Sequence, residues 1–242
     1  MNVLGIETAT AMCATAVVED EDRLAECGLE APQVHSERLL PLIDECLRKA
    51  KLELPRIDGI AVSIGPGSFT GLRIGLSVAK GLAFASGKPL VAVPTLAALA
   101  FEVCRRHRVQ TGEYILPLLD ARRDEVYCAL YRWEGSRLSE CRQAEALRLQ
   151  DIGSILPRDG NILAAGDGSE KLMRYLSSAA NSVPGAGSGI RSVACRCSAA
   201  AVAVLGSAKL HRGEVAEIES VEPLYIKEFY TVAKPQTTQV IL

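Results

Sequence analysis

The stretch that most constrains the fold is GPGSFTGLRIG, which occupies residues 65–75. It follows an apolar run, residues 57–64, that predicts a buried strand, and it opens a predicted helix at about residues 70–86. A glycine-rich turn between a strand and a helix can hold phosphate at the helix N-terminus. Neither the Gly-Lys-Ser/Thr ending of a Walker loop nor the GxGxxG dinucleotide pattern is present, so the spacing supports phosphate binding only weakly.

The same helix carries a stripe of small residues. Gly71, Gly75, Ala79 and Ala83 recur every fourth position, which places them on one helix face. Glycine inside a helix costs roughly 0.5–1 kcal/mol relative to alanine, so a close backbone approach is the usual reason for it. The approaching backbone can belong to the chain's own sheet or to another molecule, and the pattern alone does not separate these two interpretations.

Outward from this segment, the first hundred residues predict the order βββαβαβα. The pattern restarts after residue 112 with a second predicted meander, which indicates two related halves of α/β class with mixed sheets covered by helices. The predicted first half spans residues 1–103, with a helix at 198–210 returning to pack on it. The predicted second, degenerate half spans 112–192, ends in a loop at 181–192, and is followed by a tail at 214–242.

The composition excludes several classes of protein. The chain has 242 residues with a net charge of −2, whereas a dedicated nucleic-acid binder normally carries a basic excess. No uncharged apolar run of about 18 residues is present, so no membrane span is expected. The eight cysteines form no CxxC pair, which favours reduced thiols and a cytoplasmic protein without a signal peptide.

Five segments together resemble the bacterial TsaB family, also called YeaZ. Besides GPGSFTGLRIG they are LGIET at 4–8, HSE at 35–37, LDARRDEVY at 119–127 and PLY at 223–225, so the resemblance extends from residue 1 to about 227. It implies an actin-like ATPase fold built from two ribonuclease-H-like halves. It also implies a non-catalytic subunit of the machinery that makes N6-threonylcarbamoyladenosine in tRNA. The implied partners are the catalytic paralogue TsaD and the small ATPase TsaE, while another enzyme supplies threonylcarbamoyl-adenylate.

The resemblance also implies where partners bind, because the helices near residues 36–50 and 70–86 form the dimer interface in this family. Combined with the small-residue stripe, it predicts a patch that forms a homodimer in the isolated chain and binds TsaD in the complex. The predicted interface residues are Leu39, Ile43, Cys46, Leu47, Gly71, Leu72, Gly75, Leu76, Ala79 and Ala83.

Catalytic groups are missing where the resemblance would place them. TsaD has a metal-binding HxxxH motif after the strand that follows its glycine-rich helix, and the equivalent positions here are Thr95 and Leu99. TsaD also has a Ser-Gly-Gly turn near phosphate, and the equivalent residues 120–124 contain no glycine. We therefore expect no catalytic residue, metal or cofactor in this chain, with ATP and metal held by partner subunits.

The sequence is also compatible with two other functions. The chain could be a metal-dependent ATPase, kinase or glycoprotease-like hydrolase of the actin-like class that uses Glu7, Asp120 and Asp167. It could also contact tRNA directly through Arg105, Arg106 and Arg108, although the near-neutral charge favours an indirect role.

Overall fold

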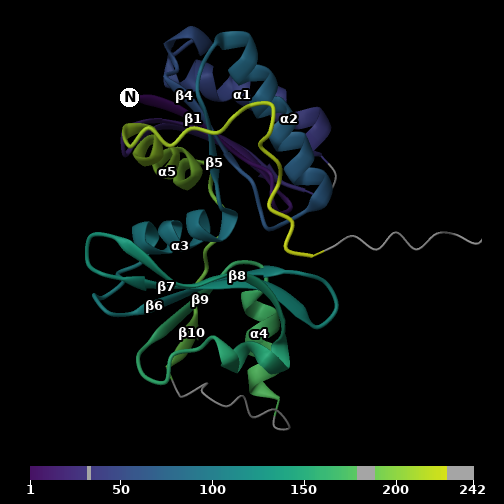
Figure 1. Cartoon of the computed structure of the whole chain (residues 1–242), viewed down its shortest axis with the longest axis vertical. Coiled ribbons are helices and arrows are strands. Elements are labelled where there is room, and N and C mark those ends of the chain that lie inside the picture. The colour runs from purple at the N-terminus through teal and green to yellow at the C-terminus, as the bar shows by residue number, and fades with distance from the viewer. Residues whose placement is uncertain (32–33, 179–188, 228–242) are drawn as a thin grey trace, which may run out of the picture.

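The computed structural model describes residues 1–31, 34–178 and 189–227. Two five-stranded sheets lie one above the other, with helices α3 and α5 between them (Figure 1). The predicted α/β fold with two ribonuclease-H-like halves is confirmed, because both sheets have the same topology. None of the helices in the described ranges is long and apolar enough to cross a membrane.

The first sheet has the order β3-β2-β1-β4-β5. Strands β1, β2 and β3 form an antiparallel meander, while β4 and β5 continue parallel to β1. The elements of this half are β1 (Asn2–Glu7), β2 (Met12–Glu19), β3 (Asp22–Glu30), α1 (His35–Ala50), β4 (Gly59–Ser63), α2 (Phe69–Ser86) and β5 (Leu90–Val93), with a 3-10 turn at Leu54–Arg56.

The second sheet has the order β10-β9-β6-β7-β8, which repeats the first when β6 is matched to β1. Its pairings also repeat, with an antiparallel meander followed by two parallel strands. The elements are β6 (Tyr114–Asp120), β7 (Glu125–Trp133), β8 (Leu138–Arg148), a 3-10 turn at Leu149–Ser154, β9 (Ile162–Ala165), α4 (Ser169–Ser177) and β10 (Ile190–Ser192).

One predicted loop is partly wrong. Residues 190–192 were expected to lie in it, but they form β10, which pairs in parallel with β9. A three-residue strand is too short to produce a recognisable hydrophobic period, so only the pairing partner reveals it. Residues 181–188 of the predicted loop lie outside the described residues.

The two halves exchange their last helices. Helix α3 (Thr95–Arg106) follows β5 in sequence but packs on β6, β7, β8 and β9 of the second sheet. Helix α5 (Ala199–His211) follows β10 and packs on β1, β2 and β4 of the first sheet. The predicted boundary at residue 103 therefore divides α3 and separates it from the sheet against which it packs. Since α3 and α5 also contact each other, they join the two halves.

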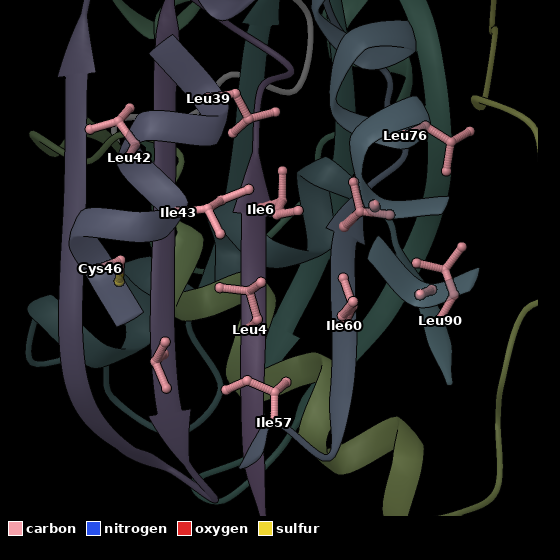
Figure 2. Packing of buried hydrophobic residues seen from close by; sticks show 14 of the residues in the cluster. Leu4, Ile6, Leu39, Leu42, Ile43, Cys46, Ile57, Ile60, Leu76 and Leu90 are labelled. Carbon is pink, nitrogen blue, oxygen red and sulfur yellow. The ribbon is translucent and has the colours of Figure 1, made fainter. Parts of the chain in front are cut away.

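The largest apolar core lies between the first sheet and the helix pair α1 and α2. Figure 2 shows α1 side chains pointing toward the sheet, with Leu39 and Ile43 beside Ile6 of β1. Helix α2 begins at a Ser68 cap, whose side chain accepts a hydrogen bond from the Gly71 amide, and ends at Gly87 with φ of 65°. These caps set the ends of α2, which packs on β4 and β1.

Candidate functional site: the α1–α2 surface and the cleft between the halves

The small-residue stripe of α2 faces the chain's own sheet. A Cβ atom on Gly71 would lie 2.1 Å from the Thr8 carbonyl oxygen, and one on Gly75 would lie 2.1 Å from Thr8 Oγ1. Ala79 and Ala83 are both fully buried. The glycines therefore allow α2 to lie directly on the end of β1. The interpretation of this stripe as a surface between molecules is corrected.

Five further members of the predicted interface are also in the core. They are Leu39, Ile43, Cys46, Leu72 and Leu76, none of them more than 4% exposed. Leu47 alone among the ten predicted residues is partly exposed, and it packs against the same core. A side chain already buried in the folded monomer has almost no further area to bury against a partner. These predicted residues therefore lie on the inward faces of α1 and α2.

The outward face of α2 is open and carries apolar side chains beside exposed polar ones. Phe84 is 79% exposed, and a Cβ atom on Gly81 would meet nothing within 4 Å. Ile74, Val78 and Leu82 lie at helical spacing from these two, and each is partly exposed while also packing against the first core. The neighbouring helix α1 adds Leu40, which is 55% exposed. We call Leu40, Ile74, Val78, Gly81, Leu82 and Phe84 the docking face.

A signal for this face was present in the sequence. Gly81 lies outside the four-residue stripe, so internal packing does not explain it, and Phe84 is the bulkiest side chain in the second half of the helix.

The two positions equivalent to metal ligands serve the structure. Thr95 is fully buried, and its hydroxyl accepts a hydrogen bond from the Gly65 amide at 3.0 Å. Leu99 is fully buried in the core beneath the second sheet. Within the described part of the chain, no group of three or more His, Cys, Asp or Glu side chains could hold a metal ion.

The turn between β6 and β7 has a backbone conformation that its lack of glycine did not predict. Arg122 and Arg123 both adopt left-handed backbone angles, with φ of 69° and 49°. The turn therefore reaches a glycine-like conformation without glycine. Its interior is occupied by Asp120 Oδ1, which accepts hydrogen bonds from the Arg122 amide at 2.9 Å and from Lys171 Nζ at 2.8 Å. Partial burial raises the pKa of Asp120, but these bonds outweigh it and leave the pKa below its usual value. The turn therefore holds the chain's own carboxylate where a phosphate-binding turn would leave space for a ligand.

A cleft of about 760 Å³ opens between the halves. Its lining carries four carboxylates, Glu26, Glu30, Asp167 and Glu170, against two guanidinium groups, Arg106 and Arg196. Both arginines already pair with glutamates, Arg106 with Glu102 and Arg196 with Glu30. The excess of negative charge disfavours a polyphosphate ligand in this cleft.

Two of the three carboxylates considered for catalysis, Asp120 and Asp167, lie together, and Glu7 lies outside the cleft lining. Asp167 lines the cleft and accepts a hydrogen bond from the Asp120 amide at 2.9 Å, and burial raises the pKa of Asp167. Glu7 is absent from the cleft lining and is fully buried. Its Oε1 accepts a hydrogen bond from the Ala9 amide at 2.6 Å, and its Oε2 has no partner among the described residues.

The arginines considered for tRNA contact lie at and just after the end of α3. Arg105 and Arg106 both pair with Glu102 on the preceding turn of the same helix. Arg108 lies two residues beyond the helix and is exposed. Local pairing of this kind is typical of a solvated helix end.

Replacing Glu7 by glutamine is expected to remove a pH dependence of stability. Burial raises the pKa of Glu7 from 4.5 to about 7, against the opposing hydrogen bond from the Ala9 amide. The unfolded chain releases this proton near pH 4.5, whereas the folded chain keeps it until about pH 7. The contribution of Glu7 to stability is therefore complete below pH 4.5 and is lost, by on the order of 3 kcal/mol, as the pH rises through 7.

Urea unfolding of both proteins at pH 4.5 and pH 8 measures this effect. Subtracting wild type from Glu7→Gln cancels all other titrating groups, and the variant should gain relative stability at pH 8. An equal difference at the two pH values would contradict the raised pKa.

Comparison with known proteins gives the family. The model of the family described as TsaD, tRNA N6-adenosine threonylcarbamoyltransferase, matches residues 29–225. The tRNA threonylcarbamoyladenosine biosynthesis protein TsaB of Escherichia coli is 34% identical over 152 residues, which cover 63% of this chain and 64% of that protein. TsaB of Bacillus subtilis is 30% identical over 167 residues, which cover 69% of this chain and 71% of that protein.

A solved structure agrees with these relatives. The structure of YeaZ from Pseudomonas aeruginosa superposes with a TM-score of 0.75 at 29% identity, covering 93% of this chain and all of that one. With the repeated sheet topology and the matched segments, these similarities show that the chain belongs to the TsaB (YeaZ) family of tRNA threonylcarbamoyladenosine biosynthesis proteins.

Proposed function

We propose that this chain is a non-catalytic subunit that binds and activates TsaD, the threonylcarbamoyltransferase, through the docking face of α1 and α2. The observation that carries the proposal is the pair Phe84 and Gly81. A phenylalanine that is 79% exposed leaves a large apolar area in water, beside a glycine with open space around it. An exposed glycine in a helix costs stability without any benefit to the monomer, unless another backbone approaches it.

The size of this surface suits a specific interface. Helices α1 and α2 have 16 and 18 residues and lie side by side (Figure 1). A specific complex typically buries ~1,200–2,000 Å² in total, which two such helices on each partner can supply. Because a two-fold patch is complementary to itself, a paralogue with a similar helix pair can replace one copy. The same face can therefore support a homodimer of the isolated chain and a heterodimer with TsaD.

The site chemistry supports a role without catalysis. Thr95 and Leu99 are used in packing, Asp120 fills the β6–β7 turn, and the cleft lining is acidic. We propose that ATP and metal are held by the partner subunits, that TsaE joins through the complex, and that tRNA is reached only indirectly. All eight cysteines are free thiols, which suits the reducing cytoplasm.

Reconstituted threonylcarbamoyl transfer to tRNA tests this role. The purified chain, supplied with threonylcarbamoyl-adenylate and tRNA, should transfer nothing and should not turn over ATP. Transfer should require TsaD, and omitting this chain from the full mixture with TsaE should reduce the rate severely. Transfer by this chain without TsaD would overturn the proposal, as would a full rate in its absence.

A further inference from the structure

The C-terminal segment at residues 214–227, which we call the strap, is attached along the first half. The Ala216 amide donates to the Leu90 carbonyl at 2.8 Å, and the Leu224 amide donates to the Ile64 carbonyl at 2.7 Å. Between these points Ile218 and Val221 pack against the core under α1 and α2. The strap is therefore a fixed part of the first half rather than a loosely placed tail.

The last part of the strap is held against the start of α2. Arg73 Nε donates to Tyr225 Oη at 2.9 Å, and the rings of Phe69 and Tyr225 lie 5.2 Å apart. A Cβ atom on Gly65 would lie 2.8 Å from the Leu224 carbonyl oxygen, so the strap passes directly over the glycine-rich turn. These contacts determine where the next two residues can reach.

Lys227 then crosses to the second half. Its ammonium group donates to Glu125 Oε2 at 2.5 Å and to the Ala121 carbonyl at 2.7 Å, and it lies 5.4 Å from the ring centre of Tyr127. About a third of each partner side chain is exposed, so this pair is less screened than an ordinary surface pair. One lysine thus binds both ends of the β6–β7 turn.

The turn bound by Lys227 is connected to the cleft. Asp120, next to Ala121, donates its amide to Asp167, and Asp167 lines the cleft between the halves. Lys171 of α4 donates to the Glu125 carbonyl at 3.0 Å and to Asp120. A displacement of the turn would therefore move groups in the wall of the cleft.

The position of the strap allows the Lys227 contact to limit rotation between the two halves. The chain passes between the halves at residue 94, between β5 and α3, and at residues 193–198, and these crossings lead into α3 and α5, which contact each other. Figure 1 shows α5 on one side of the molecule and the strap, in yellow, running down the other side beside α2. Two packed bodies joined at one side can rotate about that connection, and a tie at the other side limits the rotation.

We propose that Lys227 is a latch that sets the angle between the two halves, and with it the width of the cleft. The latch is a property of the isolated chain and does not depend on the proposed partner. A chain that does not bind TsaD would not contradict the latch. A Lys227 contact that does not set the angle would not contradict the docking face.

Distance measurement between spin labels tests the latch in the full-length chain. One label is attached to Cys141, the exposed cysteine of β8, and the other to Glu21→Cys in the β2–β3 turn. Labelled chains are diluted with unlabelled ones, so that distances between protomers do not contribute. Lys227→Met should shift or broaden the distance distribution by more than about 2 Å, since the methionine keeps the apolar stem but loses the ammonium. Glu125→Gln should have the same effect from the opposite side.

Lys80→Met provides the matched control. Lys80 Nζ also donates to the strap, at the Glu219 carbonyl 3.4 Å away, but both groups belong to the first half. This variant should leave the distribution unchanged. Wild-type distributions in both Lys227→Met and Glu125→Gln would overturn the latch, as would an equal change in Lys80→Met.

Discussion

Phe84→Glu is expected to abolish self-association and the capture of TsaD while the chain stays folded. Phe84 is 79% exposed in the monomer, so a glutamate there creates no cavity and no clash. In the proposed interface the same position would bury a charge without a partner. An aromatic anchor in an interface is typically worth about 2 kcal/mol or more, and an isologous dimer contains it twice. The homodimer should therefore weaken by about 4 kcal/mol, or roughly a thousand-fold.

Sedimentation equilibrium and capture by immobilised TsaD measure the two effects, and circular dichroism monitors the fold. Leu24→Glu is the control, because Leu24 on β3 is 41% exposed and apolar but lies outside the docking face. It should associate like wild type. A folded Phe84→Glu protein that still dimerises and still captures TsaD would refute the docking face.

Gly75→Leu is expected to unfold or severely destabilise the monomer. The position of its Cβ lies 2.1 Å from Thr8 Oγ1, and Thr8 is fully buried at the end of β1. The helix would have to lift off the sheet, which opens the core under α2. Overpacking alone costs about 1–3 kcal/mol, and the loss of this contact brings the total to about 4 kcal/mol or more.

Gly81→Ala in the same helix is the matched comparison. A Cβ atom there meets nothing within 4 Å, so the change should stabilise the monomer by roughly 0.5–1 kcal/mol through helix propensity. Urea midpoints of the two variants against wild type measure both effects. A Gly75→Leu chain with a wild-type midpoint and no dimer would restore the small-residue stripe as the contact surface.

Much of the fold follows from local pattern. The glycine-rich turn before it and Gly87 after it predict α2 at about residues 70–86, within one residue of its observed limits. The repeated meander predicts two related halves, and the matching sheet orders confirm it. The return of α5 to the first half was predicted, but the packing of α3 on the second sheet was not, because α3 is apolar enough to pack on either sheet.

The sequence indicated which helices to examine for the candidate site but not which faces of those helices are exposed. Gly71 and Gly75 correctly indicate a close approach to α2. The identity of the approaching group, Thr8, depends on the placement of α2 over β1, which joins residues more than sixty positions apart. The left-handed angles of Arg122 and Arg123 were likewise not predicted. Asp120 bonds the Arg122 amide locally, but Asp120 and Ala121 are themselves held by Lys171 and Lys227 from distant parts of the chain.

The sequence by itself therefore determined the α/β class, the duplication, the family and the residue types at positions where a catalytic relative needs histidine or glycine. These properties depend on the order and spacing of residues along the chain, so they can be recognised without coordinates. Only the tertiary structure decided which side of α2 is buried, which sheet α3 covers and which half Lys227 contacts. Each of those depends on contacts between distant residues, and a helical period of four specifies a face but not the surface that it meets.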